Sequence, residues 1–220
     1  VTLVEIYDRL ALLYGWTKYQ AQCAMKEELL CEECALVPIA RMKEQVIKEA
    51  ERGRRILFIS DTYLPEDFII RELHAHIPIK DFSLYLSSTT GLTKHSGNLF
   101  AYIAKREALE YENWQHQGDN MYSDILAPRK LGIKSLPVDY DSVTRYESTM
   151  AKAKPYMLAS TVSGSMRATR LSEHFESAHD QDVWNLACDV VGPAFFGFCY
   201  WLLSSAVRDQ VQRLYFVARD

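Results

Sequence analysis

Gly118-Asp119-Asn120-Met121-Tyr122-Ser123-Asp124 is the stretch from which the fold of this 220-residue chain can be worked out. It follows a short apolar-aromatic run, Trp114 to His116, and precedes a helix-like run that ends at Gly132. Two carboxylates, one at an expected strand end and one in the next turn, suit a hard cation such as Mg²⁺. The glycine before the first carboxylate lets the backbone approach a ligand closely. The same residues also make an ordinary turn, with Asp124 near a helix N-terminus, so the surrounding chain has to decide between these alternatives.

Short apolar runs alternate with helical patterns on both sides of this stretch. We expect strands at 56–59, 82–86, 114–116 and 133–138, and helices starting at Pro65 and covering 99–109 and 123–131. This alternation predicts an α/β fold with a parallel sheet and helices on both of its faces. Ligands of such sheets bind beyond the carboxyl ends of the strands.

Three polar side chains are therefore expected at one edge of the sheet. Ser60 ends the first strand, Lys94 lies in the loop after the second, and Asp119 ends the third. A hydroxyl donor, an ammonium and a metal-binding carboxylate together suit a phosphoryl group. Each residue alone also has an ordinary interpretation, as a helix cap, a solvated loop lysine or a turn former. The coincidence of all three at strand ends favours a phosphate site.

From Arg55 to Ile133 the chain resembles the haloacid-dehalogenase (HAD) superfamily of phosphohydrolases. The matching segments are 56–60 for the second motif of that family, 93–97 for the third and 118–124 for the fourth. The resemblance implies a HAD-like (Rossmannoid) fold. It also implies Mg²⁺-dependent hydrolysis of a phosphate ester through an aspartyl-phosphate, with a phosphorylated small molecule or sugar phosphate as the partner.

The resemblance also implies roles for individual residues. Ser60, Asp61 and Lys94 are expected to bind the phosphate, and Lys94 also offsets charge on the nucleophile. Asp119 is expected to ligate Mg²⁺. Asp124 is expected to orient Lys94 or a metal-bound water, so we count it among both the catalytic and the metal-site residues.

The first motif of the family, an Asp-x-Asp-like segment on the central strand that carries the nucleophile, cannot be placed in this chain. Asp61-Thr62-Tyr63 has Tyr63 where the second carboxylate belongs, and the assignment would leave Ser60 without a role. We therefore expect the first motif upstream of Val1, a helical cap-like region at 1–52, and a catalytically incomplete chain. Residues 60–65 resemble a subgroup of large bacterial HAD-like proteins linked with surface polysaccharides. The alternative function is a non-catalytic binding or scaffold module of a multidomain polysaccharide-biosynthesis protein.

Other regions are expected to flank a HAD-like core at 53–140. Thr2, Thr17 and Pro38 mark the starts of three helices in the cap-like region. Residues 141–180 are expected to form a linker region, with a helix from 141 to about 154 and a second helix at 167–177 within the aperiodic stretch 155–180. Residues 182–212 read as a long helix bent at Gly192-Pro193. Because 213–219 echoes 55–61, we expect 181–220 to begin a second, truncated α/β domain of the same longer chain.

Composition limits the classes of partner. The formal net charge is −4 with no basic block, which argues against nucleic-acid binding. The five cysteines lack the spacing of a disulfide framework, which indicates a reducing compartment, so we expect a cytoplasmic protein. The uncharged run at 190–207 is long enough to raise a membrane span, but we expect a buried helix there and no span.

Overall fold

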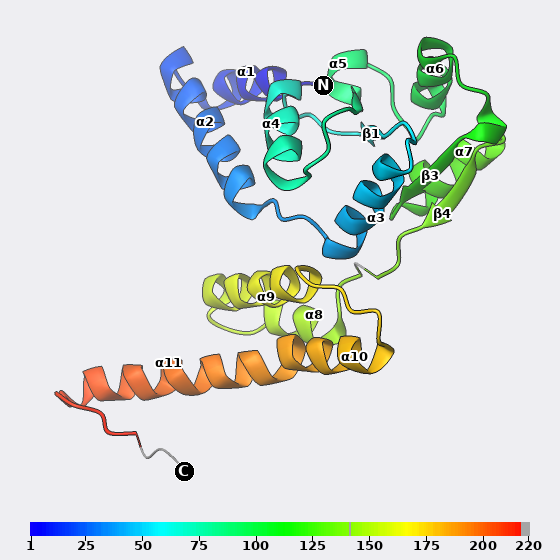
Figure 1. Cartoon of the computed structure of the whole chain (residues 1–220). Coiled ribbons are helices and arrows are strands. Elements are labelled where there is room, and N and C mark those ends of the chain that lie inside the picture. Colours follow the sequence, from blue (N-terminus) through cyan, green and yellow to red (C-terminus); the bar gives the residue numbers. More distant parts are fainter. Residues whose placement is uncertain (141, 217–220) are drawn as a thin grey trace. The chain divides into compact units, whose positions relative to one another are not determined.

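The computed structural model describes residues 1–140 and 142–216. The chain divides into two compact units, Val1–Asp141 and Ser142–Asp220, which are coloured blue to green and green to red in Figure 1. The first unit mixes helices with parallel strands, so the α/β class predicted from the sequence is confirmed at that level. The second unit, as far as it is described, is helical.

Three helices open the first unit: α1 (Leu3–Tyr14), α2 (Lys18–Ala35) and α3 (Ala40–Glu51). The expected caps of the first two are confirmed, since Thr2 and Thr17 each form a reciprocal capping box with the residue three positions on. α1 and α2 enclose a small apolar cluster built around Leu3, Tyr7 and Ala21. The start expected at Pro38 is slightly wrong, because α3 begins only at Ala40 and has no capping side chain.

The strands and helices that follow alternate as predicted. Their order is β1 (Leu57–Ser60), α4 (Glu66–His76), β2 (Ser83–Leu86), the single turn α5 (Ser87–Thr90), α6 (Asn98–Glu107), the 3₁₀ turn η1 (Tyr111–Asn113), β3 (Gln115–Gly118), η2 (Met121–Leu126), α7 (Ala127–Lys130) and β4 (Lys134–Pro137). The helix expected at 123–131 is in fact a π-helical turn, η2, that continues into α7.

The strands form two separate parallel pairs. β1 pairs with β2, with Ser60 opposite Leu86, and β3 pairs with β4, with Gly118 opposite Pro137. The prediction of one continuous sheet is therefore wrong for the described residues. The physical reason is that β1 and β3 each hydrogen-bond to a single neighbour, and none of the described strands lies between them to join the pairs.

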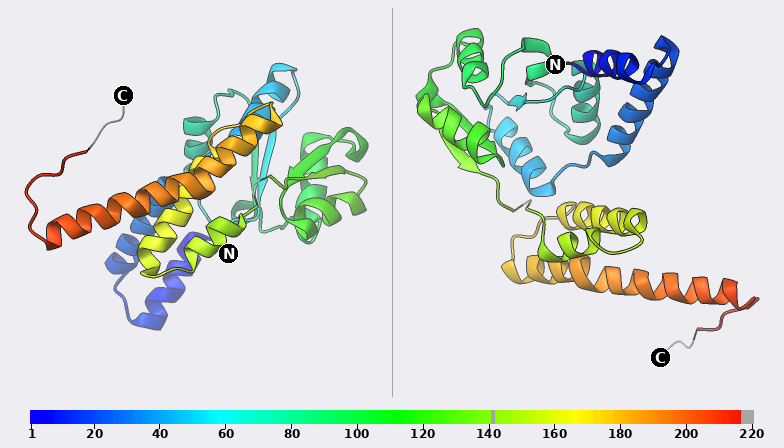
Figure 2. Two further views of the ribbon diagram at one scale, coloured as in Figure 1. Left: turned by 90° about the horizontal axis from the view of Figure 1, so that it is seen from below. Right: turned by 180° about the vertical axis from the view of Figure 1, so that it is seen from behind.

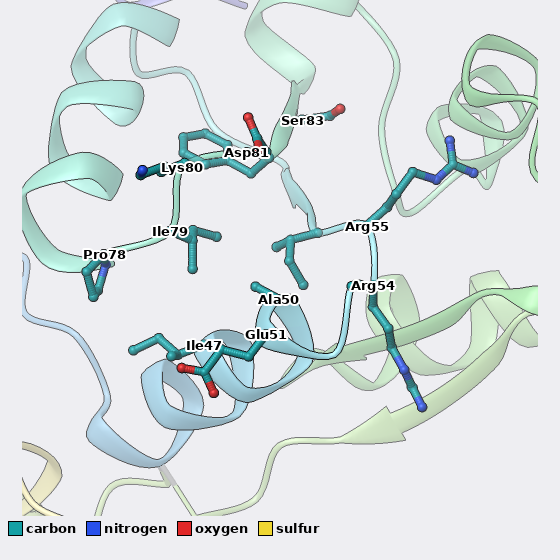
Figure 3. A pocket seen from close by; sticks show the side chains of 13 residues that line it. Ile47, Ala50, Glu51, Arg54, Arg55, Pro78, Ile79, Lys80, Asp81 and Ser83 are labelled. Carbon is teal, nitrogen blue, oxygen red and sulfur yellow. The ribbon is translucent and has the colours of Figure 1, made fainter.

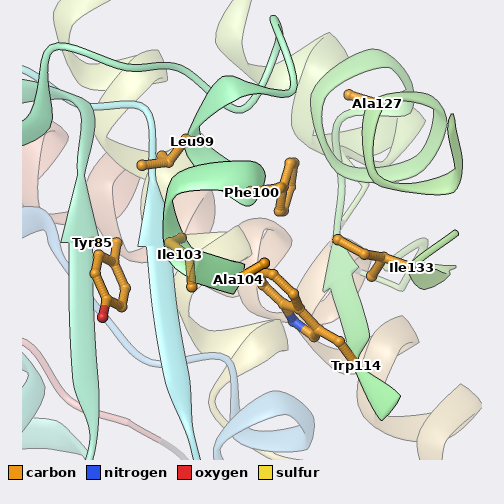
Figure 4. Packing of buried hydrophobic residues seen from close by; sticks show 8 residues of the cluster. All are labelled: Tyr85, Leu99, Phe100, Ile103, Ala104, Trp114, Ala127 and Ile133. Atoms are coloured by element: carbon orange, nitrogen blue, oxygen red, sulfur yellow. The ribbon is translucent and has the colours of Figure 1, made fainter. Parts of the chain in front are cut away.

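One hydrophobic core serves both strand pairs. Figure 4 shows Leu99, Phe100, Ile103 and Ala104 of α6 between Tyr85 of β2 on one side and residues next to β3 and β4 on the other. Leu99, Phe100 and Ile103 are fully buried. α6 therefore packs against both strand pairs, even though the backbones of the two pairs are not hydrogen-bonded to one another.

The second unit contains α8 (Arg145–Ala151), α9 (Tyr156–Leu171), α10 (Ala178–Leu186), η3 (Ala187–Val191) and α11 (Gly192–Arg208). The helix expected from 141 to about 154 is present as the shorter α8. The interpretation of 155–180 as a linker with a helix at 167–177 is wrong, because α9 fills much of it and ends at Leu171, near the start of the expected helix. A buried ion pair between Glu147 of α8 and Arg170 of α9 explains why this polar segment folds. Small residues such as Ala159 let the two helices pack closely.

α10, η3 and α11 run on as one helix in every view (Figures 1 and 2). The irregularity expected at Gly192-Pro193 is present as the π-helical turn η3 just before them, since Pro193 has no N–H to continue the ladder. The expectation of a buried helix is wrong, because Phe195 and Trp201 are 64% and 61% exposed. By length and composition alone, 178–208 is one helical stretch among the described residues that could cross a membrane.

The strand expected at 213–219 lies partly outside the described residues. Within 211–216 the backbone forms no strand. The expected beginning of a second α/β domain therefore stays a prediction.

Candidate functional site

Lys94 is the residue that connects the carboxyl ends of the strands. Its backbone N–H donates to both carboxylate oxygens of Asp61, at 2.9 and 3.1 Å, directly after β1. Its ammonium Nζ donates to Oδ1 of Asp124 in η2, at 2.6 Å. The loop that carries Lys94 is thus fastened to the end of β1 by its main chain and to the segment after β3 by its side chain.

Asp124 is buried at the centre of this arrangement, with 2% of its surface exposed. Its Oδ1 accepts from Lys94 and lies 2.9 Å from Nε2 of His116. Its Oδ2 accepts from the backbone N–H of Asn120 at 3.2 Å and from the Ser123 hydroxyl at 3.5 Å. Burial alone raises the pKa of Asp124, but the hydrogen bonds from His116 and Lys94 outweigh it and lower that pKa to about 2. Asp124 is therefore ionised at neutral pH.

Gly118 is required by the position of this carboxylate. A Cβ atom built on Gly118 would lie 2.4 Å from Cγ of Asp124, a distance at which one of the two must move. The glycine of the Gly-Asp stretch thus makes room for a carboxylate six residues later. The sequence interpretation, in which the glycine admits a ligand, did not foresee this contact.

Ser60 and Asp119 lie at the corresponding strand ends. Ser60 is the last residue of β1 and is half-buried, and Asp119 directly follows β3 and is exposed. Within the described part of the chain, neither side chain has a hydrogen bond or ion pair. They adjoin Asp61 and Asn120, which bond to Lys94 and Asp124 respectively. Both side chains are therefore available to a ligand at this edge.

The loop after β1 is held from the end of β2. The hydroxyl of Ser87 donates to the carbonyl of Thr62, and that of Ser88 donates to the carbonyl of Leu64, both at 3.0 Å. These serines therefore position the segment that carries Asp61. Both carboxylate oxygens of Asp61 accept from the Lys94 N–H. If Asp61 contacts a phosphate, we therefore expect the contact to come from its backbone N–H.

Of the two carboxylates at this edge, that of Asp119 is better suited than that of Asp124 to bind a divalent cation. Among the described residues no group of three or more histidine, cysteine, aspartate or glutamate side chains is placed to hold a metal ion. Asp119 presents an exposed carboxylate of the kind that Mg²⁺ accepts alongside several waters. Asp124 has every oxygen engaged by the protein, which favours its role in orienting Lys94 over direct ligation.

His116 is the site residue that the sequence interpretation missed. It lies in β3 and is 8% exposed, on the same face as buried Trp114, while Gln115 between them is exposed. Alternation along a strand would have placed His116 on the inner face. No local signal, however, says that its ring meets a carboxylate eight residues later.

A hollow of about 660 Å³ lies at the opposite ends of β1 and β2, between α3 and the chain that enters β2 (Figure 3). Of its cationic lining residues, Arg54 and Arg55 pair with Glu49 and Glu107, and Lys80 is the third. Because ligands of parallel sheets bind at the carboxyl ends of strands, this hollow does not coincide with the Lys94 site.

Comparison of the sequence with models of known protein families gave no match, and a search of curated proteins gave none at the threshold applied.

Proposed function

We propose that this chain carries the phosphate-binding and charge-compensating part of a Mg²⁺-dependent phosphohydrolase of the HAD type. The observation that carries the proposal is the Lys94–Asp124 pair, set between the ends of β1 and β3. A lysine ammonium has three donors, and one of them is bonded to Asp124 within the described part of the chain. The other two are available to an anionic ligand beside Ser60 and Asp119.

The charges of the site suit a phosphoryl group. Asp124 is ionised and buried, so it neutralises Lys94 in part and holds the ammonium in one orientation. Ser60 supplies a hydroxyl donor at the neighbouring strand end. Electrostatic stabilisation by fixed donors of this kind is the largest contribution to many phosphoryl and acyl transfers.

Asp119 is the residue that would hold Mg²⁺. The cation, when bound, supplies countercharge for the phosphoryl oxygens. Asp124 supports the site from behind Lys94 and does not need to touch the ion.

β1 and β3 each have one edge that pairs with no described strand. These edges support the proposal that the nucleophile lies on a further strand outside these residues. Among the described strands, β1 pairs only with β2 and β3 only with β4, so a further parallel strand inserted between β1 and β3 would join the two pairs into one sheet. The resemblance to HAD proteins places the nucleophilic aspartate on the central strand. We propose that the nucleophile reaches the Lys94 site from such a strand, in a longer chain.

The test uses a chain extended upstream by the missing strand, with a generic phosphate ester as substrate and Mg²⁺ varied. Lys94→Met is expected to lower kcat by about a hundredfold, as loss of one charge-stabilising donor does elsewhere. The matched control is Lys105→Met, at an exposed lysine of α6. A kcat for Lys94→Met equal to that of the wild type and of Lys105→Met would refute the proposal.

A further inference from the structure

Beneath the Lys94–Asp124 pair lies a histidine that the proposed phosphohydrolase chemistry does not itself require. His116 has its ring in the core, with the Phe100 ring edge-on at 5.0 Å and Nε2 at 2.9 Å from Asp124 Oδ1. A histidine packed in this way could serve only as core filling. The identity of the atom that it contacts argues for a more specific role.

The direction of the hydrogen bond follows from the partners. An ionised carboxylate accepts hydrogen bonds and donates none, so the proton between these atoms belongs to Nε2 of His116. Oδ1 of Asp124 therefore receives two donors, one from β3 below and one from Lys94 above. Oδ2 is bonded to Asn120 and Ser123. These four donors fix the orientation of the Asp124 carboxylate, and the hydrogen bond to Oδ1 then fixes the position of the Lys94 ammonium.

Of these four donors, the ring of His116 alone is anchored in the hydrophobic core. Lys94 lies in a loop, and Asn120 and Ser123 belong to the same turn as Asp124 itself. His116 projects from β3, and its contact ring Phe100 is fully buried in α6. A rigid donor of this kind fixes the carboxylate relative to the sheet, as residues behind a metal or catalytic ligand commonly do.

We propose that His116 is a positioning residue, whose Nε2–H donor holds Asp124 so that the Lys94 ammonium points its remaining donors at the strand-end edge. This inference rests on the proposed function for its catalytic consequence, but its structural part can be tested without turnover.

Two substitutions of His116 distinguish a role as hydrogen-bond donor from a role in packing alone. In His116→Gln the side-chain amide nitrogen occupies the position of Nε2 and keeps the donor. In His116→Asn the amide nitrogen corresponds to Nδ1 and falls short of Oδ1. Both variants are polar and smaller than histidine, so both bear a similar packing cost. His179→Gln, at an exposed histidine of the second unit, is the control.

The first readout is proton–nitrogen correlation NMR of the lysine ammonium groups in the 220-residue protein, with no ligand added. In the wild type, Lys94 is expected to exchange its ammonium protons with water about tenfold more slowly than exposed lysines, because it is hydrogen-bonded and shielded. His116→Gln is expected to retain this protection and His116→Asn to lose it. Equal protection of Lys94 in both variants overturns the inference.

The second readout is turnover in the extended chain. His116→Asn is expected to lower kcat about ten- to a hundredfold with little change in KM, as loss of supporting residues does, and His116→Gln to restore most of it. If no variant and no wild type hydrolyses phosphate esters, while Lys94 protection still follows the Gln and Asn pattern, the proposed function fails and the positioning role stands. If turnover is present but equal in both variants, the positioning role fails and the proposed function stands.

Discussion

At the scale of the residue, the site depends on a single buried carboxylate. Asp124 receives donors from β3, from the Lys94 loop and from its own turn, and Gly118 leaves the space in which it lies. The carboxylate is thus the point at which three segments of the chain meet. Its protonation should therefore be visible in the stability of the fold.

We predict that the stabilisation of the fold by ionised Asp124 is lost as the pH falls below about 4. Its pKa in the fold is about 2, below the ordinary 3.8, so the unfolded chain binds the proton more readily. The stabilisation is complete above the unfolded pKa and is lost as the pH falls towards 2. The difference corresponds to about 2 kcal/mol.

The measurement is urea unfolding of the wild type and Asp124→Asn at several pH values between 6 and 2. The gap in the free energy of unfolding between them should shrink as the pH falls through this window. Asp119→Asn, at the exposed carboxylate nearby, is the control variant. A gap for Asp124→Asn that does not change with pH would contradict the hydrogen-bonding arrangement described for Oδ1.

At the scale of the element, the helices of the second unit are held by one buried ion pair. Nε of Arg170 donates to Oε1 of Glu147 at 2.8 Å, and the two side chains are 7% and 1% exposed. The Arg170 guanidinium also donates to the carbonyl of Ser142, and its own carbonyl accepts from the Trp184 indole. α8, α9 and α10 therefore meet at this pair.

We predict that Arg170→Met destabilises the second unit by about 3–5 kcal/mol, because Glu147 would then be buried without its cation. The double variant Glu147→Met with Arg170→Met should recover part of that loss, since no lone charge remains. Thermal unfolding followed by circular dichroism measures both. Arg208→Met, which breaks an exposed pair with Asp209, should change little. If Arg170→Met lowers the stability of the second unit no more than Arg208→Met does, the Glu147–Arg170 pair is dispensable for folding.

At the scale of the whole molecule, the first unit carries the Lys94 site at the ends of two separate strand pairs. The Lys94 site has a cation, a hydroxyl and carboxylates, and both carboxylate oxygens of Asp61 accept from the Lys94 N–H. Under the proposed function, the nucleophile comes from outside these residues and Asp61 serves to fasten the Lys94 loop.

We predict that the 220-residue chain does not hydrolyse a generic phosphate ester with or without Mg²⁺. The assay is release of phosphate by the purified chain, compared with a chain extended upstream to include the proposed nucleophile. Turnover by the short chain that disappears in Asp61→Asn would make Asp61 the nucleophile, and the assignment of Ser60 to the second motif would then be wrong.

Much of the local structure follows from the sequence. The capping boxes at Thr2 and Thr17 and the order of strands and helices in 55–137 were predictable, because they depend on residues a few positions apart. The polar strand ends at Ser60 and Asp119 were predictable for the same reason. The helix of 156–171 was missed, since a stretch rich in serine, threonine and alanine has little hydrophobic periodicity and folds around the Glu147–Arg170 pair.

The amino-acid sequence by itself determined the order of strands and helices in 55–137 and which polar groups follow the strands. The tertiary structure alone decided that Lys94 and His116 share one oxygen of Asp124, that Gly118 makes room for that carboxylate, and that the strands form two pairs with open edges. The reason is physical. Caps and periodicity arise from neighbours along the chain, whereas a hydrogen bond across the core depends on which segments pack together, and that is set by the burial of α6 between the strand pairs.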